Sequence, residues 1–408
     1  MTTHQRPIWD RGEEIDGEML SFTIGDDWLH DRRLVEHDIR GSLAHVAGLV
    51  HAGLIDAGAG ETIRGGLTSL LEAWRAGEWN VESSDEDVHS AVEWRLIEAI
   101  GEDGGRMHLG RSRNDQVAVD MRLWLRAASA TAGSRLSRLI AAVATAEAEH
   151  GQLPLPGYTH LRRAMPSSVG DWLAAHRAAF EADLAQLDDA ARRWATCPLG
   201  SGSGYGIPLA LARDFVAREL DFDGGPETPV TAVQHGRGRA ELAYLTALES
   251  VALSMGKLAF DLWLFSSEEF GFVAFPVSLT TGSSLMPQKR NPDALELVRA
   301  HARQVVADRG ALVDVLRDLP SGYHRDFQLI KPPLFRGHDR AHAAVGMLAR
   351  LVEGLELHGD HLRDAAADPK LRATERALRA AAEGASFRGA YRQEAQAAPP
   401  HPASPEID

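Results

Sequence analysis

Hydrophobic residues recur along most of this chain at spacings of three and four, the pattern of one face of an α-helix. The longest stripe lies between residues 114 and 150 and includes Val117, Met121, Trp124 and Leu139. As one continuous helix it would be about 55 Å long at 1.5 Å per residue. Similar stripes predict further helices over residues 169–194, 242–265, 295–316 and 345–355.

These stripes predict an all-α fold built as a bundle of long helices. No run alternates convincingly between apolar and polar residues, and repeated βα units are absent, so a doubly wound sheet is not expected. Helices this long expose more than one apolar face, which predicts a bundle completed by other subunits. We expect a helical N-terminal domain (1–102), a central long-helix bundle (103–356), a short helical C-terminal domain (357–395) and a Pro- and Ala-rich disordered tail (396–408).

Composition narrows the class of partner. The formal net charge is −15, which argues against nucleic acid as the main partner. The single cysteine, Cys197, excludes an internal disulfide framework and suits a reducing, cytoplasmic compartment. The first twenty residues lack a signal-peptide pattern, and no apolar run reaches the roughly 20 residues of a membrane span.

Three polar, glycine-containing segments each precede a predicted long helix: residues 107–116, 155–168 and 279–295. Helix N-termini carry partial positive charge and free N–H groups, so they suit anions. The segments supply the following cationic, hydroxyl and amide side chains: Arg111, Arg113 and Asn114; Thr159, His160, Arg162 and Arg163; Ser283, Ser284, Lys289 and Asn291.

Each segment also has a simpler interpretation when it is taken alone. The first fits a helix cap with solvated arginines, the histidine of the second fits a structural turn, and the third fits a flexible connector. Their common position before long helices favours an anion-binding site. The residues by themselves lead to an anion-binding helical bundle and no further.

The third segment contains GSSLMPQKRNP at residues 282–292, which resembles the GSSxMPxKxNP signature loop of the fumarase/aspartase superfamily. Within that superfamily, HLGRSRNDQVAVD, PGYTHLRRAMP and DEDVHSAVEWRLIEAIG are similar to segments of the argininosuccinate lyase family. DRRLVEHDI and YHRDFQLIK, which ends at Lys331, add two more, and the likeness covers roughly residues 20–392.

The resemblance implies an all-α chain of three domains that assembles as a homotetramer around a core of long helices. Its active sites would be shared between subunits, with three different chains meeting at each one. The implied reaction is the β-elimination of argininosuccinate, a small anionic substrate, to arginine and fumarate. It uses no cofactor or metal and belongs to arginine biosynthesis.

The resemblance also implies roles for particular residues. Ser283 would be the carbon base, and His160, positioned by Glu296, would serve the leaving nitrogen, although these two roles are interchangeable at this stage. The implied substrate-binding residues are Arg113, Asn114 and Thr159 for the succinyl carboxylates, Ser284, Lys289 and Asn291 in the loop, and Tyr323, Gln328, Lys331 and Asp27 around the amino-acid end.

Departures from the family gather around the amino-acid end. Asp27 stands in place of a serine, HGRGRAE (235–241) replaces an SRD-type segment, and Leu329-Ile330 replaces an acidic pair; Leu109, Arg162 and Met165 also differ. These departures leave open a relative that releases fumarate from another N-substituted aspartate. A non-catalytic structural or scaffold homologue is the alternative of another class.

Three other interpretations fit less well. An ammonia-lyase with a cyclised prosthetic group would need Ala-Ser-Gly, which is absent. The glycine-rich segment GSGSGYG (200–206) fails the GxGxxG spacing and follows a helical pattern. The HDRAH segment (338–342) pairs two histidines on a helix but offers no third metal ligand.

Overall fold

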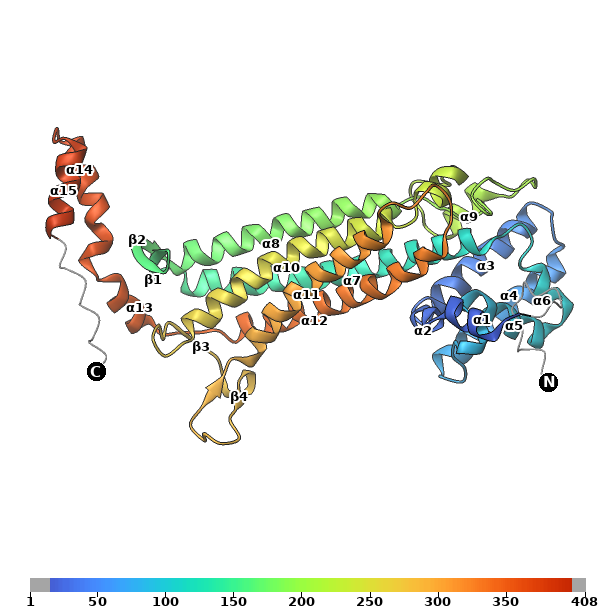
Figure 1. The fold of residues 1–408 in the computed structure, drawn as a ribbon, viewed down its shortest axis with the longest axis horizontal. Helices are drawn as coiled ribbons and strands as arrows, with labels where there is room; N and C mark the ends of the chain where they lie inside the picture. The colour runs from blue at the N-terminus through green and yellow to red at the C-terminus, as the bar shows by residue number, and fades with distance from the viewer. Residues whose placement is uncertain (1–14, 398–408) are drawn as a thin grey trace. The chain divides into compact units, whose positions relative to one another are not determined.

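Long helices dominate residues 15–397, the part of the chain that the computed structural model describes (Figure 1). The fold is all-α, as the hydrophobic stripes predict, and each of the five stripes is a helix. These helices are α7 (Arg113–His150), α8 (Val169–Ala191), α10 (Arg239–Phe265), α11 (Asp293–Leu316) and α12 (Lys331–Glu353).

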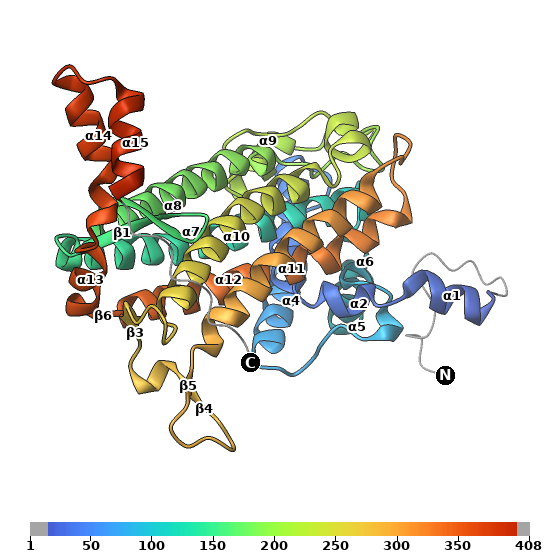
Figure 2. The same ribbon diagram turned by 60° about the vertical axis from the view of Figure 1, so that its left-hand side comes forward.

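The chain divides into two compact units, and each long helix contributes one part to each unit. Unit 1 comprises residues 1–134, 183–252 and 301–342, and unit 2 comprises 135–182, 253–300 and 343–408. Within each unit the helix segments lie side by side (Figures 1 and 2). The predicted three-domain division stays a prediction.

Aromatic side chains form part of the core of unit 1. The ring of Trp124 on α7 lies 4.7 Å from Phe335 on α12 and 6.2 Å from Tyr244 on α10, measured between centroids. All three side chains are buried, so the apolar faces of three long helices meet here. The Tyr244 hydroxyl hydrogen-bonds to Nδ1 of His338 at 2.7 Å, which satisfies its polar end.

Shorter helices complete unit 1, and polar caps fix two of their starts. Asp56 accepts a hydrogen bond from the Ala59 N–H (2.9 Å), and Asp87 accepts one from the Ser90 N–H (2.8 Å). The helices are α1 (Gly17–Ile24), α2 (Asp27–Asp31), α3 (Val35–His51), α4 (Ala57–Arg75), α5 (Val88–Ile100), α6 (Glu102–Arg106) and α9 (Arg213–Glu219), with 3-10 turns at Ser83–Asp85, Arg192–Trp194 and Arg325–Ile330 and a π-helical turn at Val230–His235.

Unit 2 carries the short strands, which the sequence analysis did not expect. Prolines and a glycine interrupt the alternation of β1 and β2, and a bulge shifts their register between Gly157 and Tyr158, so no period-2 signal was visible. The antiparallel pairs are β1 (Pro154–Thr159) with β2 (Arg162–Ser168), β3 (Val273–Ala274) with β6 (Glu356–Leu357), and β4 (Thr281–Gly282) with β5 (Arg290–Asn291).

Three helices end the described chain, namely α13 (Gly359–Ala366), α14 (Ala373–Ala382) and α15 (Phe387–Ala397), with 3-10 turns at Val277–Leu279 and Pro369–Arg372 elsewhere in the unit. The predicted tail starts at residue 396, whereas α15 continues to Ala397; the rest of the predicted tail, 398–408, lies outside the described part. The first fourteen residues, where a leader was judged absent, lie outside it too. Within residues 15–397, no helix is both long and apolar enough to cross a membrane.

The His338 environment predicts a pH-dependent contribution to stability. Burial lowers the pKa of His338 to about 4, from 6.5. The unfolded chain therefore binds a proton that the folded chain excludes, so this site reduces stability as pH falls from 6.5 towards 4. Replacing His338→Gln keeps a hydrogen-bonding partner for Tyr244 and removes the titration.

We expect the melting temperature of the His338→Gln variant to fall less steeply than that of the wild type over this pH range. The exposed His361→Gln variant is the matched control and should follow the wild-type curve. Parallel curves for wild type and His338→Gln would contradict the assignment.

Candidate active site

A cavity of about 120 Å³ lies within unit 1. Its walls come from α2, the segment that leads into α5 and the first turn of that helix, the start of α7, the turn before α10, and the segment from Tyr323 to Lys331. Six residues predicted from the sequence line it together: Asp27, Arg113, Asn114, Tyr323, Gln328 and Lys331. The remaining lining residues are Asp31, Glu86, Asp87, His89, Val117, Arg237, Arg325 and Phe327.

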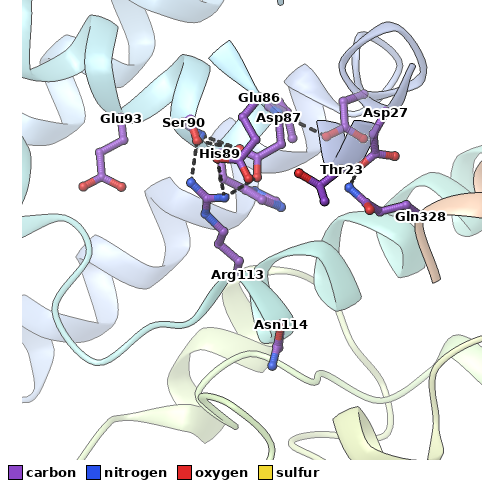
Figure 3. Close-up of polar contacts among 12 residues, drawn as sticks. Thr23, Asp27, Glu86, Asp87, His89, Ser90, Glu93, Arg113, Asn114 and Gln328 are labelled. Atoms are coloured by element: carbon purple, nitrogen blue, oxygen red, sulfur yellow. Dashed lines mark hydrogen bonds and ion pairs between the residues drawn. The ribbon is translucent and has the colours of Figure 1, made fainter. Parts of the chain in front are cut away.

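Arg113 and Asn114 line the cavity from the first turn of α7. Figure 3 shows Arg113 directed at an acidic group on the segment that leads into α5. Its guanidinium lies 3.0 Å from Asp87 and 3.2 Å from Glu86, and it donates a 2.7 Å hydrogen bond to the Ser90 hydroxyl. Burial opposes the charge, but the two carboxylates overcome it and raise the pKa of Arg113. This arginine is therefore held firmly in its charged form.

The glycine-rich segment GSGSGYG supports the start of α7. The buried Asp115 carboxylate accepts hydrogen bonds from the N–H groups of Gly200 (3.0 Å) and Gly202 (2.8 Å) and from that of Ser112 (2.9 Å). Gly200 and Gly202 have φ values of 84° and 59°, which glycine adopts readily. The segment thus anchors the helix that carries Arg113 and Asn114.

Lys331 is engaged by the chain's own carboxylates. It is 3% exposed, and its Nζ lies 2.9 Å from an Asp27 oxygen and 2.5 Å from Asp31. Burial opposes this charge, yet Asp31 and Asp27 raise the pKa of Lys331 above its usual value. Gln328 donates a hydrogen bond to Asp27 at 3.2 Å (Figure 3). Asp27, which the resemblance left unexplained, thus pairs with two residues expected to hold substrate.

Arg237 is a cavity residue that the sequence analysis did not identify. It lies between the π-helical turn Val230–His235 and the start of α10, and it is 7% exposed. Its guanidinium carbon lies 5.7 Å from the ring centre of Tyr323 and 5.3 Å from that of Phe327. The sequence feature that could have indicated it is the HGRGRAE segment, a departure from the family to which no role was assigned.

A buried ionic group adjoins the cavity and was also missed. The Asp38 carboxylate lies 2.7 Å from His89 Nδ1, and an Asp120 oxygen lies 3.7 Å from the same atom. Burial opposes protonation of His89, but Asp38 and other carboxylates raise its pKa. One oxygen or nitrogen atom from each of Asp38, His89 and Asp120 lies within 4.8 Å of the others, which is close enough for the three to hold a metal ion. The buried Arg111 cation interacts with both carboxylates, so an internal charge network explains them better.

The other seven predicted residues belong to unit 2: Thr159, His160, Ser283, Ser284, Lys289, Asn291 and Glu296. Thr159 and His160 lie at the tip of the β1–β2 hairpin. Thr159 pairs with Arg162, so His160 and Leu161 form a two-residue loop, with φ values of 54° and 56°. Such turns favour asparagine and glycine, and non-glycine residues at positive φ concentrate at functional sites. The two positive φ values fit the geometry of a two-residue hairpin turn.

The signature loop connects β4 to β5 and is mostly exposed. Ser283 Oγ accepts hydrogen bonds from the N–H groups of Met286 (3.1 Å) and Leu285 (3.3 Å). Both N–H groups direct the positive end of their dipoles at the serine oxygen. Asn291 Nδ2 donates to the Gly282 carbonyl at 3.5 Å, across the base of the loop.

Glu296 follows the loop on α11 and is exposed. Its carboxylate accepts a 3.2 Å hydrogen bond from Trp263 Nε1 on α10. The pairing with His160 that the resemblance implies is not among the hydrogen bonds of the described residues. The positioning role of Glu296 stays a prediction.

Comparisons with known proteins place the chain in a family. A family model described as lyase matches residues 19–307. The argininosuccinate lyase of Sorangium cellulosum is 44% identical, with 95% of this chain and 89% of that protein aligned. The enzyme of the same name from Xanthomonas euvesicatoria is 43% identical, over 96% and 90% of the two chains.

Solved structures agree on the fold. An EDDS lyase in complex with formate superposes with a TM-score of 0.77 at 23% identity, covering 94% of this chain and 76% of that one. A class II fumarase from Schistosoma mansoni gives a TM-score of 0.77 at 17% identity, covering 87% and 84%. With more than 40% identity to curated relatives over almost its full length, the chain belongs to the argininosuccinate lyase family, carbon–nitrogen lyases of the fumarase/aspartase superfamily.

Proposed function

We propose that this protein cleaves argininosuccinate to arginine and fumarate by a cofactor-free β-elimination, as a step of arginine biosynthesis in the cytoplasm. The observation that carries the proposal is Ser283, whose Oγ accepts two backbone N–H groups in an intact signature loop. Hydrogen bonds donated to an oxygen stabilise its anionic form, so they favour a serine that takes up a proton from carbon.

The elimination requires stabilisation of negative charge. Loss of a proton beside a succinyl carboxylate produces an enediolate, which preorganised donors must hold. Lys289 and Asn291 belong to the same loop as Ser283 and are suited to this task, with Ser284 as a further donor. Asn114 offers an amide and Thr159 a hydroxyl for the second carboxylate. Arg113 can contribute as well, because its side chain is 28% exposed and its guanidinium has N–H donors beyond those that engage Glu86, Asp87 and Ser90.

The leaving nitrogen requires a proton when the C–N bond breaks. His160 is suited to this step because its imidazole is carried on a fixed, two-residue turn at the tip of a hairpin. We therefore assign Ser283 as base and His160 as acid, with Glu296 as its positioning carboxylate. The exchange of these two roles remains the alternative mechanism.

We further propose a homotetramer with active sites shared between subunits. The lining of the cavity in the described chain comes from unit 1 alone, whereas His160 and the signature loop belong to unit 2. Residues of other copies would complete each site. Large apolar side chains of α10 and α11 are exposed in the single chain, including Leu253 (64%) and Leu297 (61%). Burial of such side chains favours association of long helices.

A second candidate is the release of fumarate from another N-substituted aspartate. The observation that favours it is the pairing of Lys331 with Asp27, which leaves one cation fewer to bind the amino-acid end of the substrate. A non-catalytic role is disfavoured because Ser283, His160 and Lys289 are all present.

Purified protein incubated with argininosuccinate should release fumarate, followed by its ultraviolet absorbance. Arginine formed in equal amount, measured by chromatography, would identify the second product. Fumarate release from other N-substituted aspartates but not from argininosuccinate would favour the second candidate, and no fumarate from any of them would favour the non-catalytic one.

Ser283→Ala should lower kcat by about 10³-fold or more, the scale of a group that acts in the transition state. Substrate binding should stay close to that of the wild type, because the hydroxyl contributes little before the proton moves. Rapid-quench kinetics and equilibrium binding measure the two effects. Ser284→Ala is the matched control within the loop and should retain more activity, and a near-normal kcat for Ser283→Ala would assign the proton transfer to another group.

Two inactive variants, His160→Asn and Lys289→Ala, should complement each other. Asparagine tolerates positive φ, so His160→Asn removes the imidazole while keeping the hairpin turn. If each site takes these two residues from different subunits, mixed tetramers contain some sites with neither change. Partial activity should return after the two are refolded together, and the absence of recovery in confirmed mixed tetramers would place both residues on one chain.

A further inference from the structure

Four cations line the cavity of unit 1, and their partners differ. Arg113 faces Glu86 and Asp87, and Lys331 faces Asp27 and Asp31.

Arg325, the third cation, lies 3.1 Å from Glu86 and donates a hydrogen bond to the Thr23 carbonyl at 2.8 Å. Arg237, the fourth cation, donates no hydrogen bond from its buried Nε and Nη1 atoms to any described residue. These N–H groups and the positive charge of Arg237 are therefore available to a ligand.

Arg237 lies close to two aromatic rings. The guanidinium lies against the rings of Tyr323 and Phe327, at 5.7 and 5.3 Å. Aromatic rings attract the face of the cation, whereas the five N–H donors point outward in its plane. A planar guanidinium whose position is restricted by such contacts is suited to two parallel hydrogen bonds to a carboxylate.

Burial makes this arrangement costly without a ligand. Arg237 is 7% exposed, and a buried cation without hydrogen bonds loses the solvation that it has in water. Stacking on two rings offsets part of this cost, and a bound carboxylate would offset more. The side chain therefore has the features of a binding residue more than those of a structural one.

Lys331 has the opposite character. Its ammonium group has three donors, and it already contacts two carboxylates inside the chain. A substrate carboxylate at this position would meet Asp27 and Asp31 together with the lysine. The net charge of Lys331, Asp27 and Asp31 together is negative, so this group does not attract a substrate carboxylate.

We infer that Arg237 binds the α-carboxylate of the amino-acid half of the substrate, and that Asp27 has made Lys331 a structural cation. The inference rests on the proposed function, and it names the class of leaving group as an α-amino acid. Tyr323 and Phe327 position the guanidinium, and Gln328, which hydrogen-bonds to Asp27, lines the same cavity.

Arginine and agmatine provide a test that does not depend on turnover. Agmatine has the guanidinium of arginine but lacks the α-carboxylate, so it isolates the contact proposed for Arg237. Calorimetric titration of the wild type should show arginine binding at least about tenfold more tightly than agmatine, the scale of a charge-assisted contact. In Arg237→Gln, arginine affinity should fall to that of agmatine, while agmatine affinity stays unchanged.

The kinetic arm of the experiment uses argininosuccinate. Arg237→Gln should raise KM by about tenfold or more and change kcat much less, because the contact exists in both ground and transition states. Arg237→Lys keeps the charge without the planar fork and should give an intermediate KM. Circular dichroism of both variants checks that each is folded.

Arg239→Gln is the matched control, because Arg239 lies two residues further along and is exposed. It should leave arginine and agmatine affinities unchanged. Equal wild-type affinities for arginine and agmatine would overturn the inference, even if argininosuccinate is cleaved. The inference would also be overturned if Arg237→Gln lost affinity for succinate and kept its affinity for free arginine. That result would show that the Arg237 side chain binds the succinyl half of the substrate. Failure of the proposed function would appear separately, as absence of fumarate release by the wild type.

Discussion

The buried ion pair of Lys331 with Asp27 and Asp31 determines much of the chemistry of the cavity. It joins the short helix α2 to the first residue of α12, which are about three hundred residues apart in the chain. Removing one partner of such a group leaves an uncompensated buried charge, which is strongly destabilising. This constraint explains why Lys331 contributes to the fold at a position where the family resemblance suggests a substrate contact.

The cations that line the cavity differ in the groups that they contact within the chain. Acidic residues engage Arg113, Arg325 and Lys331, whereas Arg237 is supported by aromatic faces. Among the four cations that line the cavity, Arg237 is the one without a carboxylate partner in the described part of the chain. The two departures from the family, at Asp27 and in the HGRGRAE segment, are therefore related. Asp27 engages Lys331, so this lysine is not available to the ligand, and the HGRGRAE segment supplies Arg237 instead.

The elements assigned to proton transfer differ physically from this cavity. His160 and Leu161 hold positive φ values on a two-residue turn, and Ser283 sits in an exposed loop between two-residue strands. Local hydrogen bonds and backbone conformation contribute to the geometry of both elements.

The sequence alone determined the five long helices and the chemistry of three polar segments, because helical periodicity and short motifs are local properties. It could not reveal the β1–β2 hairpin, whose proline, glycine and bulge hide its alternation. Nor could it assign partners to Asp27, Lys331, Glu296 or Arg237. Those assignments depend on contacts between segments far apart in the chain, and only the tertiary structure decided which buried charges pair with each other and which one is left for a ligand.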